Sequence, residues 1–305
     1  MSALPQPLAQ TQAAFDGWMK SVQAAIEVAL QGFLPPVTQA PQRLHEAMHY
    51  AVLDGGKRVR PLLVFGAGAL FDAPVDTMTR AAAALEMIHA YSLVHDDMPC
   101  MDDDALRRGK PTVHVQYDEA TALLVGDALQ AQAFLVLSET AASPVTTLPM
   151  LRLLAHAAGS NGMCGGQAID LASVGVSLSL AQLEQMHQLK TGALLRASVL
   201  LGAMAGQHLN ADQTAALDAY ATAVGLAFQV VDDVLDATAD SATLGKTAGK
   251  DAADNKPTYV SILGLEPSRL LAEKLRDDAH QAIQSFGDKA QRLRQLADLI
   301  VQRKA

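Results

Sequence analysis

Five aspartates lie within nine consecutive positions that begin at Asp96. Pro99 lacks a backbone donor and disfavours helical geometry in the residue before it, which predicts a helix end directly after Asp97. Asp102 is too far round a regular helix to share a face with Asp96. The break after Asp97 would return Asp102 to the side of Asp96. Carboxylates packed so densely suit Mg²⁺, which binds through one or two carboxylates, several waters and the phosphates of a substrate.

Residues that suit a phosphate surround this aspartate cluster. Arg107 and Arg108 follow it and present the paired donors that phosphate oxygens accept. Upstream, His89, Ser92 and Asp96 are spaced three and four apart and therefore share one helix face. This alignment favours substrate contact for His89, whereas an isolated histidine in an apolar helix would be interpreted as part of the core.

A second aspartate cluster decides between a metal site and a solvated acidic loop. Asp232 and Asp236 lie four apart on one face of a strongly apolar segment, and Gln229 precedes them on the same side. An unpaired charge in such a helix would be costly to desolvate. We therefore predict that the two clusters form two walls of one metal–phosphate cleft.

Lys57 and Arg60 lie at a glycine-rich turn directly before Pro61. Proline is favoured in the first turn of a helix, and the start of a helix is a usual place to hold an anion. Further along, Gln167 and Asp170 are three apart in a second glycine-rich stretch and face the same way. The first of these segments is a candidate phosphate site.

Residues 238–257 show no apolar periodicity and carry Lys246, Lys250 and Lys256. A Gly-Lys-Thr triplet at Lys246 suggests a phosphate-binding P-loop, but Asp240 stands where that loop needs glycine and no strand precedes it. We expect instead a mobile lid that carries the lysines over the aspartate cleft.

Elsewhere, apolar residues recur at intervals of three and four, which predicts helices. The expected helices cover residues 11–33, 42–54, 76–97, 118–139, 149–160, 180–205, 211–237, 266–285 and 288–303, with one more that opens at Pro61. A short linker containing Pro144 and Pro149 precedes the helix at 149–160. Gly192 in Lys190-Thr191-Gly192 predicts a kink that frees backbone carbonyls. No segment alternates as a strand does, so the fold class is all-α.

The composition limits the possible partners. A chain of 305 residues that is 50% hydrophobic can bury a large core, and a net charge of −9 argues against nucleic-acid binding. We see neither a signal peptide nor an apolar run near the ~20 residues of a membrane span. Two cysteines, Cys100 and Cys164, form no disulfide framework. We therefore expect a cytoplasmic protein that is not membrane-embedded.

The motifs resemble, in order, those of the trans-type (E) isoprenyl diphosphate synthases, and most closely the bacterial farnesyl diphosphate synthases. They read Asp96-Asp97-x-x-x-x-Asp102 with Arg107-Arg108-Gly109, Asp232-Asp233-x-x-Asp236, Gly55-Gly56-Lys57-Arg58-Val59-Arg60-Pro61, Lys190-Thr191-Gly192, and the segment from Gly245-Lys246 to Lys256. They cover roughly residues 40–265. The resemblance implies one polyprenyl synthase domain over residues 1–305, a bundle of ten or more helices around a central cleft. Residues 1–10 are expected to be a flexible segment.

The resemblance also implies a reaction: head-to-tail condensation of dimethylallyl or geranyl diphosphate with isopentenyl diphosphate, giving (2E,6E)-farnesyl diphosphate and diphosphate. Three Mg²⁺ would assist ionisation, held by Asp96, Asp102 and Asp232, with Asp97 and Asp236 as further candidates. The residues implied to bind the allylic diphosphate are Arg107, Lys190, Lys246 and Lys256.

By the same resemblance, isopentenyl diphosphate occupies a separate metal-free pocket. Its implied ligands are Lys57, Arg60, His89 and Arg108. Thr191 and Gln229 would face the allylic cation as dipoles. The last proton would go to the departing diphosphate, so no side-chain base is expected. Family members are homodimers, and the helix near residues 118–139 is the candidate interface.

Product length in this family is set beneath the first aspartate motif, where each helical turn is about 5.4 Å long. Tyr91, five residues before Asp96, is a candidate floor for the growing chain, and Ser92 leaves the adjacent face open. A geranylgeranyl diphosphate synthase is the alternative within this chemistry. A terpene cyclase would carry a different second motif, and a non-catalytic partner subunit should have lost one of the two motifs; both are intact.

Overall fold

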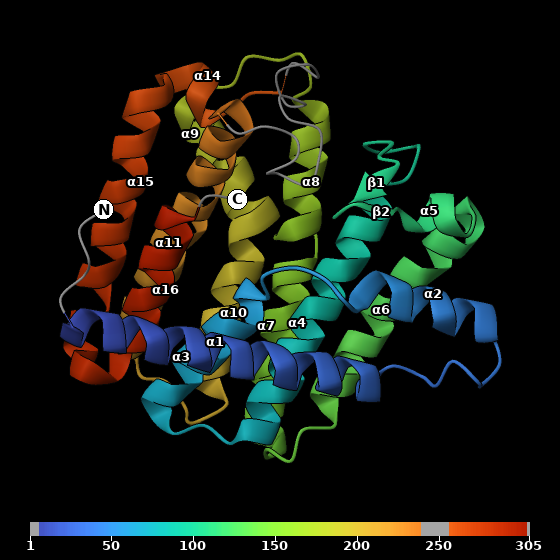
Figure 1. Cartoon of the computed structure of the whole chain (residues 1–305), viewed down its shortest axis with the longest axis horizontal. Helices are drawn as coiled ribbons and strands as arrows, with labels where there is room; N and C mark the ends of the chain where they lie inside the picture. Colours follow the sequence, from blue (N-terminus) through green and yellow to red (C-terminus); the bar gives the residue numbers. More distant parts are fainter. Residues whose placement is uncertain (1–5, 239–255, 304–305) are drawn as a thin grey trace.

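The computed structural model describes residues 6–238 and 256–303, which form an all-α bundle (Figure 1). The predictions of an all-α fold and of ten or more helices are confirmed. The α-helices are α1 (Gln6–Phe33), α2 (Gln42–Val52), α3 (Val59–Gly68), α4 (Val75–Asp96), α5 (Val113–Gln116), α6 (Glu119–Ser138), α7 (Pro144–Ala158), α8 (Met163–Ala172), α9 (Leu180–His187), α10 (Ala193–Met204), α11 (Ala211–Thr238), α14 (Tyr259–Leu263), α15 (Leu265–Ala282) and α16 (Gln291–Gln302). Shorter elements are the 3₁₀ helices Ala69–Phe71 and Gln284–Ala290, the π-helical segment Gln188–Gly192, and the strands β1 (Leu106–Arg107) and β2 (Lys110–Pro111).

Helix α4 lies at the centre of the bundle and packs against α3, α6 and α10. Four consecutive alanines, residues 81–84, are fully buried on it, and such small side chains let helices approach closely from several sides. Helix α1 runs across the other helices (Figure 1) and buries Phe15, Val22, Ile26 and Leu30 of its predicted apolar stripe. The first aspartate motif therefore stands at the end of a helix that packs against several others.

Two helices begin about five residues before their expected positions. Helix α1 begins at Gln6, whereas the helix was expected from residue 11. Helix α7 begins at Pro144, where a linker was expected, because proline at the first position needs no backbone donor and has a suitable φ. Pro149 is accommodated inside that helix.

Both strands are only two residues long, and they pair antiparallel as a hairpin after the first aspartate motif. A pair this short has no room for the alternation by which strands are recognised in a sequence. Its effect is local, because it sets the direction of Arg107 and Arg108.

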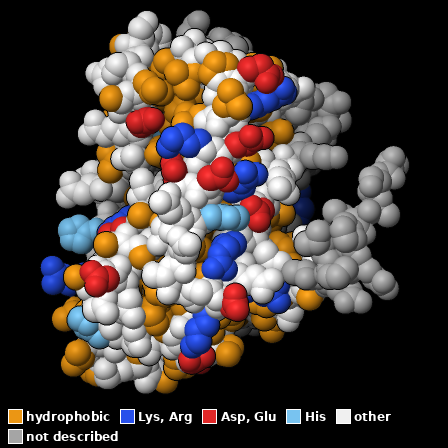
Figure 2. Space-filling view, turned by 90° about the vertical axis from the view of Figure 1, so that its left-hand side faces the viewer, with side chains coloured by type: hydrophobic (Ala, Val, Ile, Leu, Met, Phe, Trp, Pro, Cys, Tyr) orange, Lys and Arg blue, Asp and Glu red, His pale blue; other side chains and the backbone are white. Residues whose placement is uncertain are grey.

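The face that carries α15 shows acidic and basic side chains interspersed, with no continuous basic surface in that view (Figure 2). Ion pairs one turn apart on α15 account for part of this pattern, such as Lys274 with Asp278. Against the sequence-based expectation, α6 and α11 are long and apolar enough to cross a membrane. Core helices can have the same length and apolar composition, and more than half of the apolar part of α11 is buried in the bundle. These two helices alone therefore do not indicate a membrane protein.

Candidate active site

The first aspartate motif folds back on itself where α4 ends. The backbone N–H of Asp102 donates to the carbonyl of Asp96 over 2.9 Å, and that of Asp104 donates to Asp97 over 3.1 Å. The helix ends at Asp96, with Asp97 as the capping residue. The predicted break is therefore confirmed, and it returns Asp102 to the side of Asp96.

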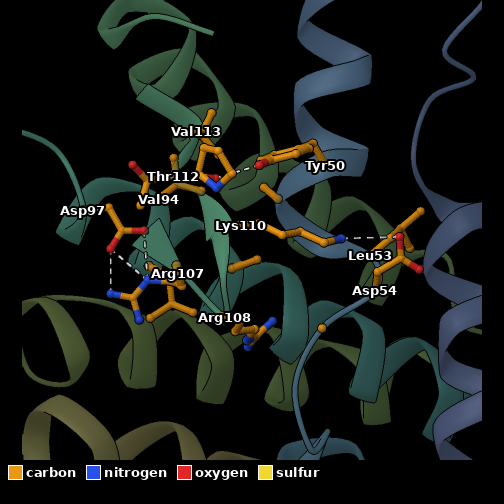
Figure 3. A pocket seen from close by; sticks show the side chains of 15 residues that line it. Tyr50, Leu53, Asp54, Val94, Asp97, Arg107, Arg108, Lys110, Thr112 and Val113 are labelled. Atoms are coloured by element: carbon orange, nitrogen blue, oxygen red, sulfur yellow. Dashed lines mark hydrogen bonds and ion pairs between the residues drawn. The ribbon is translucent and has the colours of Figure 1, made fainter. Parts of the chain in front are cut away.

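Asp97 is engaged by an arginine. Its carboxylate accepts hydrogen bonds of 2.6 to 2.9 Å from Nε and Nη2 of Arg107, which the β1–β2 hairpin holds in place. Figure 3 shows this pair at one end of a small pocket of about 60 Å³. Burial raises the pKa of Asp97, although Arg107 opposes the shift. The structure thus places Asp97 and Arg107 with each other, whereas the sequence indicated a metal ion and a diphosphate as their partners.

The two aspartate clusters meet in one cavity of about 270 Å³, the acidic cavity. Asp96 and Asp102 line it from the end of α4, and Asp232 lines it from α11. Burial raises the pKa of Asp96, the charge of Asp102 adds to this shift, and Lys190 opposes it. Asp236, one turn further along α11, is buried and does not line this cavity.

Among the described residues, no group of three or more acidic, histidine or cysteine side chains is close enough to enclose a metal ion by itself. This arrangement fits Mg²⁺, which binds through few carboxylates and completes its shell with waters and substrate phosphates. The donor set is also chemically suitable, since it consists of carboxylate oxygens and a glutamine amide.

Cationic and amide side chains complete the acidic cavity. Lys190 Nζ pairs with Asp170 over 2.5 Å, and Lys256 Nζ pairs with Asp102 over 3.1 Å. Thr191 donates to the amide oxygen of Gln229 over 3.0 Å. In addition, the amide of Gln167 bonds Asp96. Lys246 and Lys250 lie outside the described residues.

Lys190 and Thr191 stand on the π-helical segment Gln188–Gly192, which confirms the predicted interruption of the helix at 180–205. A π-helical turn has one residue more than an α-helical turn, and such turns are frequent at functional sites. Close packing fixes the segment, because a Cβ at Gly166 of α8 would overlap the backbone of Lys190. The kink is therefore held by α8 as well as by the local sequence.

A second cavity of about 450 Å³, the basic cavity, is lined by the three cations and the histidine predicted for isopentenyl diphosphate. Its lining includes Lys57, Arg60, His89 and Arg108, and also Arg303, which the sequence reasoning missed. The turn before α3 makes room for this arrangement, since a Cβ at Gly55 would overlap the guanidinium of Arg108.

Burial of His89, together with the nearby Arg60, holds the pKa of its imidazole well below the usual value. His89 is therefore neutral and can offer one donor and one acceptor. Burial likewise lowers the pKa of Arg60, although Glu86 opposes the shift. Glu86 itself pairs with Arg58 over 2.6 Å. The basic cavity is thus a place where positive charge is concentrated and an anion would be stabilised.

A third cavity of about 360 Å³, the apolar cavity, runs beneath the first aspartate motif. Tyr91, Met163 and Leu171 line it, together with Ser92 and Cys164. Tyr91 is buried, and its hydroxyl lies 3.5 Å from the sulfur of Cys164. Both candidate length-determining positions, 91 and 92, face the same space.

The three cavities share walls. Asp96, Lys190 and Thr191 line both the acidic and the apolar cavity. Asp232 lines both the acidic and the basic cavity, and Arg60 and His89 line the basic and the apolar cavity. Each of the three cavities therefore adjoins the other two.

Comparison with known proteins identifies the family. The polyprenyl synthetase family model matches residues 41–296. The chain belongs to the polyprenyl synthetase family. The resemblance drawn from the motifs is thereby confirmed.

Members of this family are similar over nearly the whole chain. A farnesyl diphosphate synthase of Escherichia coli is 47% identical over 281 residues, 90% of this chain and 94% of that one. A solved FPP/GFPP synthase from Zymomonas mobilis is 44% identical with a TM-score of 0.85, covering 95% and 99% of the two chains. A geranyltransferase from Helicobacter pylori, solved with magnesium and isoprenyl diphosphate, is 31% identical with a TM-score of 0.82 and covers 98% of each chain.

Two features of the site were hidden in the sequence. Arg303 follows an ordinary amphipathic helix, and no motif in the surrounding sequence indicates that its side chain contacts α11. Gln167 and Asp170 were recognised as sharing a face, but only the fold reveals that they hold Asp96 and Lys190.

Proposed function

We propose that this protein is a farnesyl diphosphate synthase acting through one polyprenyl synthase domain. The C1–O bond of an allylic diphosphate breaks, and its electron pair leaves with diphosphate. The double bond of isopentenyl diphosphate attacks C1, and a proton is then lost to the departing diphosphate. The observation that carries the proposal is that the acidic cavity shares Asp96 with the apolar cavity and Asp232 with the basic cavity.

The acidic cavity holds the allylic diphosphate. Asp96, Asp102 and Asp232 would hold three Mg²⁺ ions. Asp97 and Asp236, which are buried and lie near these ligands in the sequence, would add negative charge to the site. Bound metal neutralises the charge that develops on the leaving diphosphate. Lys190 and Lys256 turn from their present carboxylate partners to the diphosphate, and Lys246 and Arg107 add to this contact. Cations that are fixed next to developing negative charge usually account for a large part of the rate enhancement of an enzyme.

Thr191 and Gln229 act as dipoles next to the allylic cation. Their mutual hydrogen bond fixes both oxygens in position before the substrate binds. Fixed dipoles stabilise the cation and do not attack it, which suits a reaction that water must not quench.

The basic cavity holds isopentenyl diphosphate through Lys57, Arg60 and Arg108. Neutral His89 adds a donor that does not depend on pH in the neutral range. Since this cavity adjoins the apolar cavity at Arg60 and His89, the new carbon–carbon bond forms where the growing chain can enter the apolar space.

Tyr91 ends the apolar cavity and limits the product to fifteen carbons. Its ring is buried, and its hydroxyl contact with Cys164 anchors it to α8. The alternative is a geranylgeranyl diphosphate synthase, in which the product would extend past this position.

The protein acts in the cytoplasm as a homodimer. Leu123, Leu124 and Leu135 of α6 and the neighbouring Val115 are each about half exposed. Apolar side chains gathered on one helix favour burial against another protein. A second copy would cover this strip without disturbing the cavities.

One experiment tests the proposal. The purified protein is incubated with Mg²⁺, isopentenyl diphosphate and dimethylallyl diphosphate, and the dephosphorylated alcohols are separated by chromatography. Farnesol as the main product supports the proposal. Geranylgeraniol would indicate the alternative synthase, a cyclic hydrocarbon a terpene cyclase, and no turnover a non-catalytic partner subunit.

A second measurement tests the assignment of the two diphosphates. Lys57→Ala and Arg60→Ala should raise the KM of isopentenyl diphosphate much more than that of geranyl diphosphate. An equal rise for both substrates would mean that the sites are wrongly assigned.

A further inference from the structure

The imidazole of His187 is buried at the edge of the acidic cavity. His187 is the last residue of α9, and the π-helical segment Gln188–Gly192 follows it directly. Within residues 6–238 and 256–303, neither Nδ1 nor Nε2 of this ring has a hydrogen-bond partner, although only 7% of the residue is exposed. His45 is equally buried, yet its Nδ1 bonds the carbonyl of Gln39 over 3.0 Å. An unpaired buried polar atom is costly, which points to a partner that arrives with a ligand.

Tyr259 fixes the plane of this imidazole. The two rings stack, with 5.5 Å between their centres and 19° between their planes. Tyr259 opens α14, which contacts α9 near the top of Figure 1. Its backbone N–H donates to Asp233 over 2.8 Å. Through Tyr259, the second aspartate motif therefore holds the His187 ring in one orientation.

The acidic cavity is the space that can supply the missing partner. His187 lines it together with Asp170 and Lys190. Burial lowers the pKa of His187 to about 4, although Asp170 opposes the shift, so the neutral ring has one donor and one acceptor nitrogen. A carboxylate or a bare phosphate has no hydrogen to give to the acceptor nitrogen, whereas water has one. A polar cavity of about 270 Å³ has room for ordered water.

Mg²⁺ would bring such water into this cavity. The ion keeps several waters when it binds through one or two carboxylates, and these waters need acceptors. The proposed ligands Asp96, Asp102 and Asp232 line the same cavity as His187. Side chains that bond the ligands of a metal from outside its coordination shell orient those ligands and strengthen metal binding.

We propose that His187 is a positioning residue for the metal of the acidic cavity: its neutral imidazole accepts a hydrogen bond from a water bound to Mg²⁺. This inference rests on the proposed function. Because the ring finds this partner only when the metal-bound diphosphate is present, His187 contributes to the binding of that ligand and not to the stability of the free protein. Tyr259 lies behind the ring, outside the lining of the acidic cavity, and orients it.

Isothermal titration calorimetry tests this role without turnover. Geranyl thiolodiphosphate, whose sulfur bridge resists ionisation, is titrated into the protein at increasing Mg²⁺ concentrations and without isopentenyl diphosphate. The unaltered protein defines the Mg²⁺ concentration that gives half-maximal binding. His187→Phe keeps a stacked ring and loses both nitrogens, and it should raise this concentration at least about tenfold, the lower end for lost partners of metal ligands.

Two further measurements on His187→Phe exclude a general loss of structure. The affinity for isopentenyl diphosphate without Mg²⁺ should not change, since His187 is not among the residues that line the basic cavity. The midpoint of urea unfolding at pH 7 should be equal or higher, because an apolar ring replaces polar atoms that are unpaired in the free protein.

Tyr259→Phe is the matched control. It removes the other buried polar atom of the stack, the Tyr259 hydroxyl, which has no hydrogen-bond partner in the described part of the chain. This variant should keep the Mg²⁺ requirement of the unaltered protein. His187→Gln restores a donor and an acceptor without a ring, and it should require less Mg²⁺ than His187→Phe. If His187→Phe does not fold, His187→Leu takes its place in this comparison.

Three results would overturn the inference. One is an unchanged Mg²⁺ requirement in His187→Phe. Another is an equal rise in Tyr259→Phe, which would make the stacked pair a structural element only. The third is a requirement in His187→Gln as high as that of His187→Phe. If the unaltered protein does not bind geranyl thiolodiphosphate at any Mg²⁺ concentration, the proposed function itself fails.

Discussion

Replacing Tyr91 by alanine should lengthen the product. The ring lies on α4 five residues before Asp96 and lines the apolar cavity of about 360 Å³. Its removal should extend this cavity along α4 by about one helical turn, roughly 5.4 Å. One isoprene unit has a similar length, so twenty-carbon product should appear where fifteen-carbon product predominates. Chromatography of the dephosphorylated alcohols measures the ratio.

The same change should destabilise the empty protein. Tyr91 is only 5% exposed, and truncating a buried aromatic side chain costs about 3–5 kcal/mol when the site does not collapse. A longer allylic diphosphate would fill the space that the ring leaves. Its presence at about 100 times its Kd should restore about 2.7 kcal/mol through binding to the folded state alone. Thermal unfolding with geranylgeranyl diphosphate, compared with geranyl diphosphate, checks this expectation.

Two matched variants separate the ring from its hydroxyl group and from its neighbour. Tyr91→Phe keeps the ring and loses only the contact with Cys164, so its product should remain at fifteen carbons. Ser92→Phe adds a ring beside Tyr91 in the same cavity. The reasoning is refuted if Tyr91→Ala still gives only farnesol while Ser92→Phe shortens the product, since the chain would then run along the face of Ser92.

Four other changes test the site and its surroundings. Asp232→Ala should lower kcat by at least about 10²–10³ with unchanged helical content by circular dichroism, because it removes stabilisation of developing charge. Asp97→Asn leaves Arg107 without its carboxylate and should cost about 1.5–3 kcal/mol in urea unfolding, with little change in the Mg²⁺ concentration required for activity. Burial lowers the pKa of His187 from 6.5 to about 4, so its contribution to stability is present above pH 6.5 and is lost as the pH falls towards 4. His187→Phe should remove this part of the pH dependence, about 3 kcal/mol, from urea unfolding. Leu124→Asp should halve the mass measured by light scattering.

Each of these expectations has a clear opposite. Unchanged kcat in Asp232→Ala would exclude its role with the metal, and a large shift in the Mg²⁺ requirement of Asp97→Asn would make Asp97 a ligand. If the stability of His187→Phe depends on pH as that of the unaltered protein does, other titrating groups determine this pH dependence. For the dimer, Leu270→Asp on α15 is the control, since Leu270 is also exposed and lies on another helix.

The sequence predicted the fold well because apolar periodicity is strong in nearly every helix of the bundle. It failed at boundaries where proline stands, since the same residue can end a helix or begin one, as Pro144 does. It also missed the β1–β2 hairpin, whose strands are too short to show a pattern.

For the site, spacing along one helix predicted which residues share a face, and the second aspartate cluster predicted that two walls would meet. Pairing between distant segments could not be predicted in this way. The ion pairs Arg107–Asp97 and Arg303–Asp232 are examples, since each depends on how the chain returns through space. The family resemblance assigned Arg107 to a substrate, and the structure adds that it already has a buried carboxylate as its partner.

The π-helical segment Gln188–Gly192 has a consequence for how this region tolerates mutation. Substitutions there alter one side chain, whereas deleting a single residue would let the chain rewind as regular α-helix from Leu180 to Met204. Because a π-helical turn holds one residue more than an α-helical turn, such a deletion would keep the faces of α9 and α10 nearly in register. His187 should still stack on Tyr259, and Leu194 should stay in the core. A deletion within α9 or α10 would instead turn the residues that follow it by about 100°. A library of single-residue deletions should therefore show a narrow zone at these five positions where the protein still folds, between flanks where deletions prevent folding.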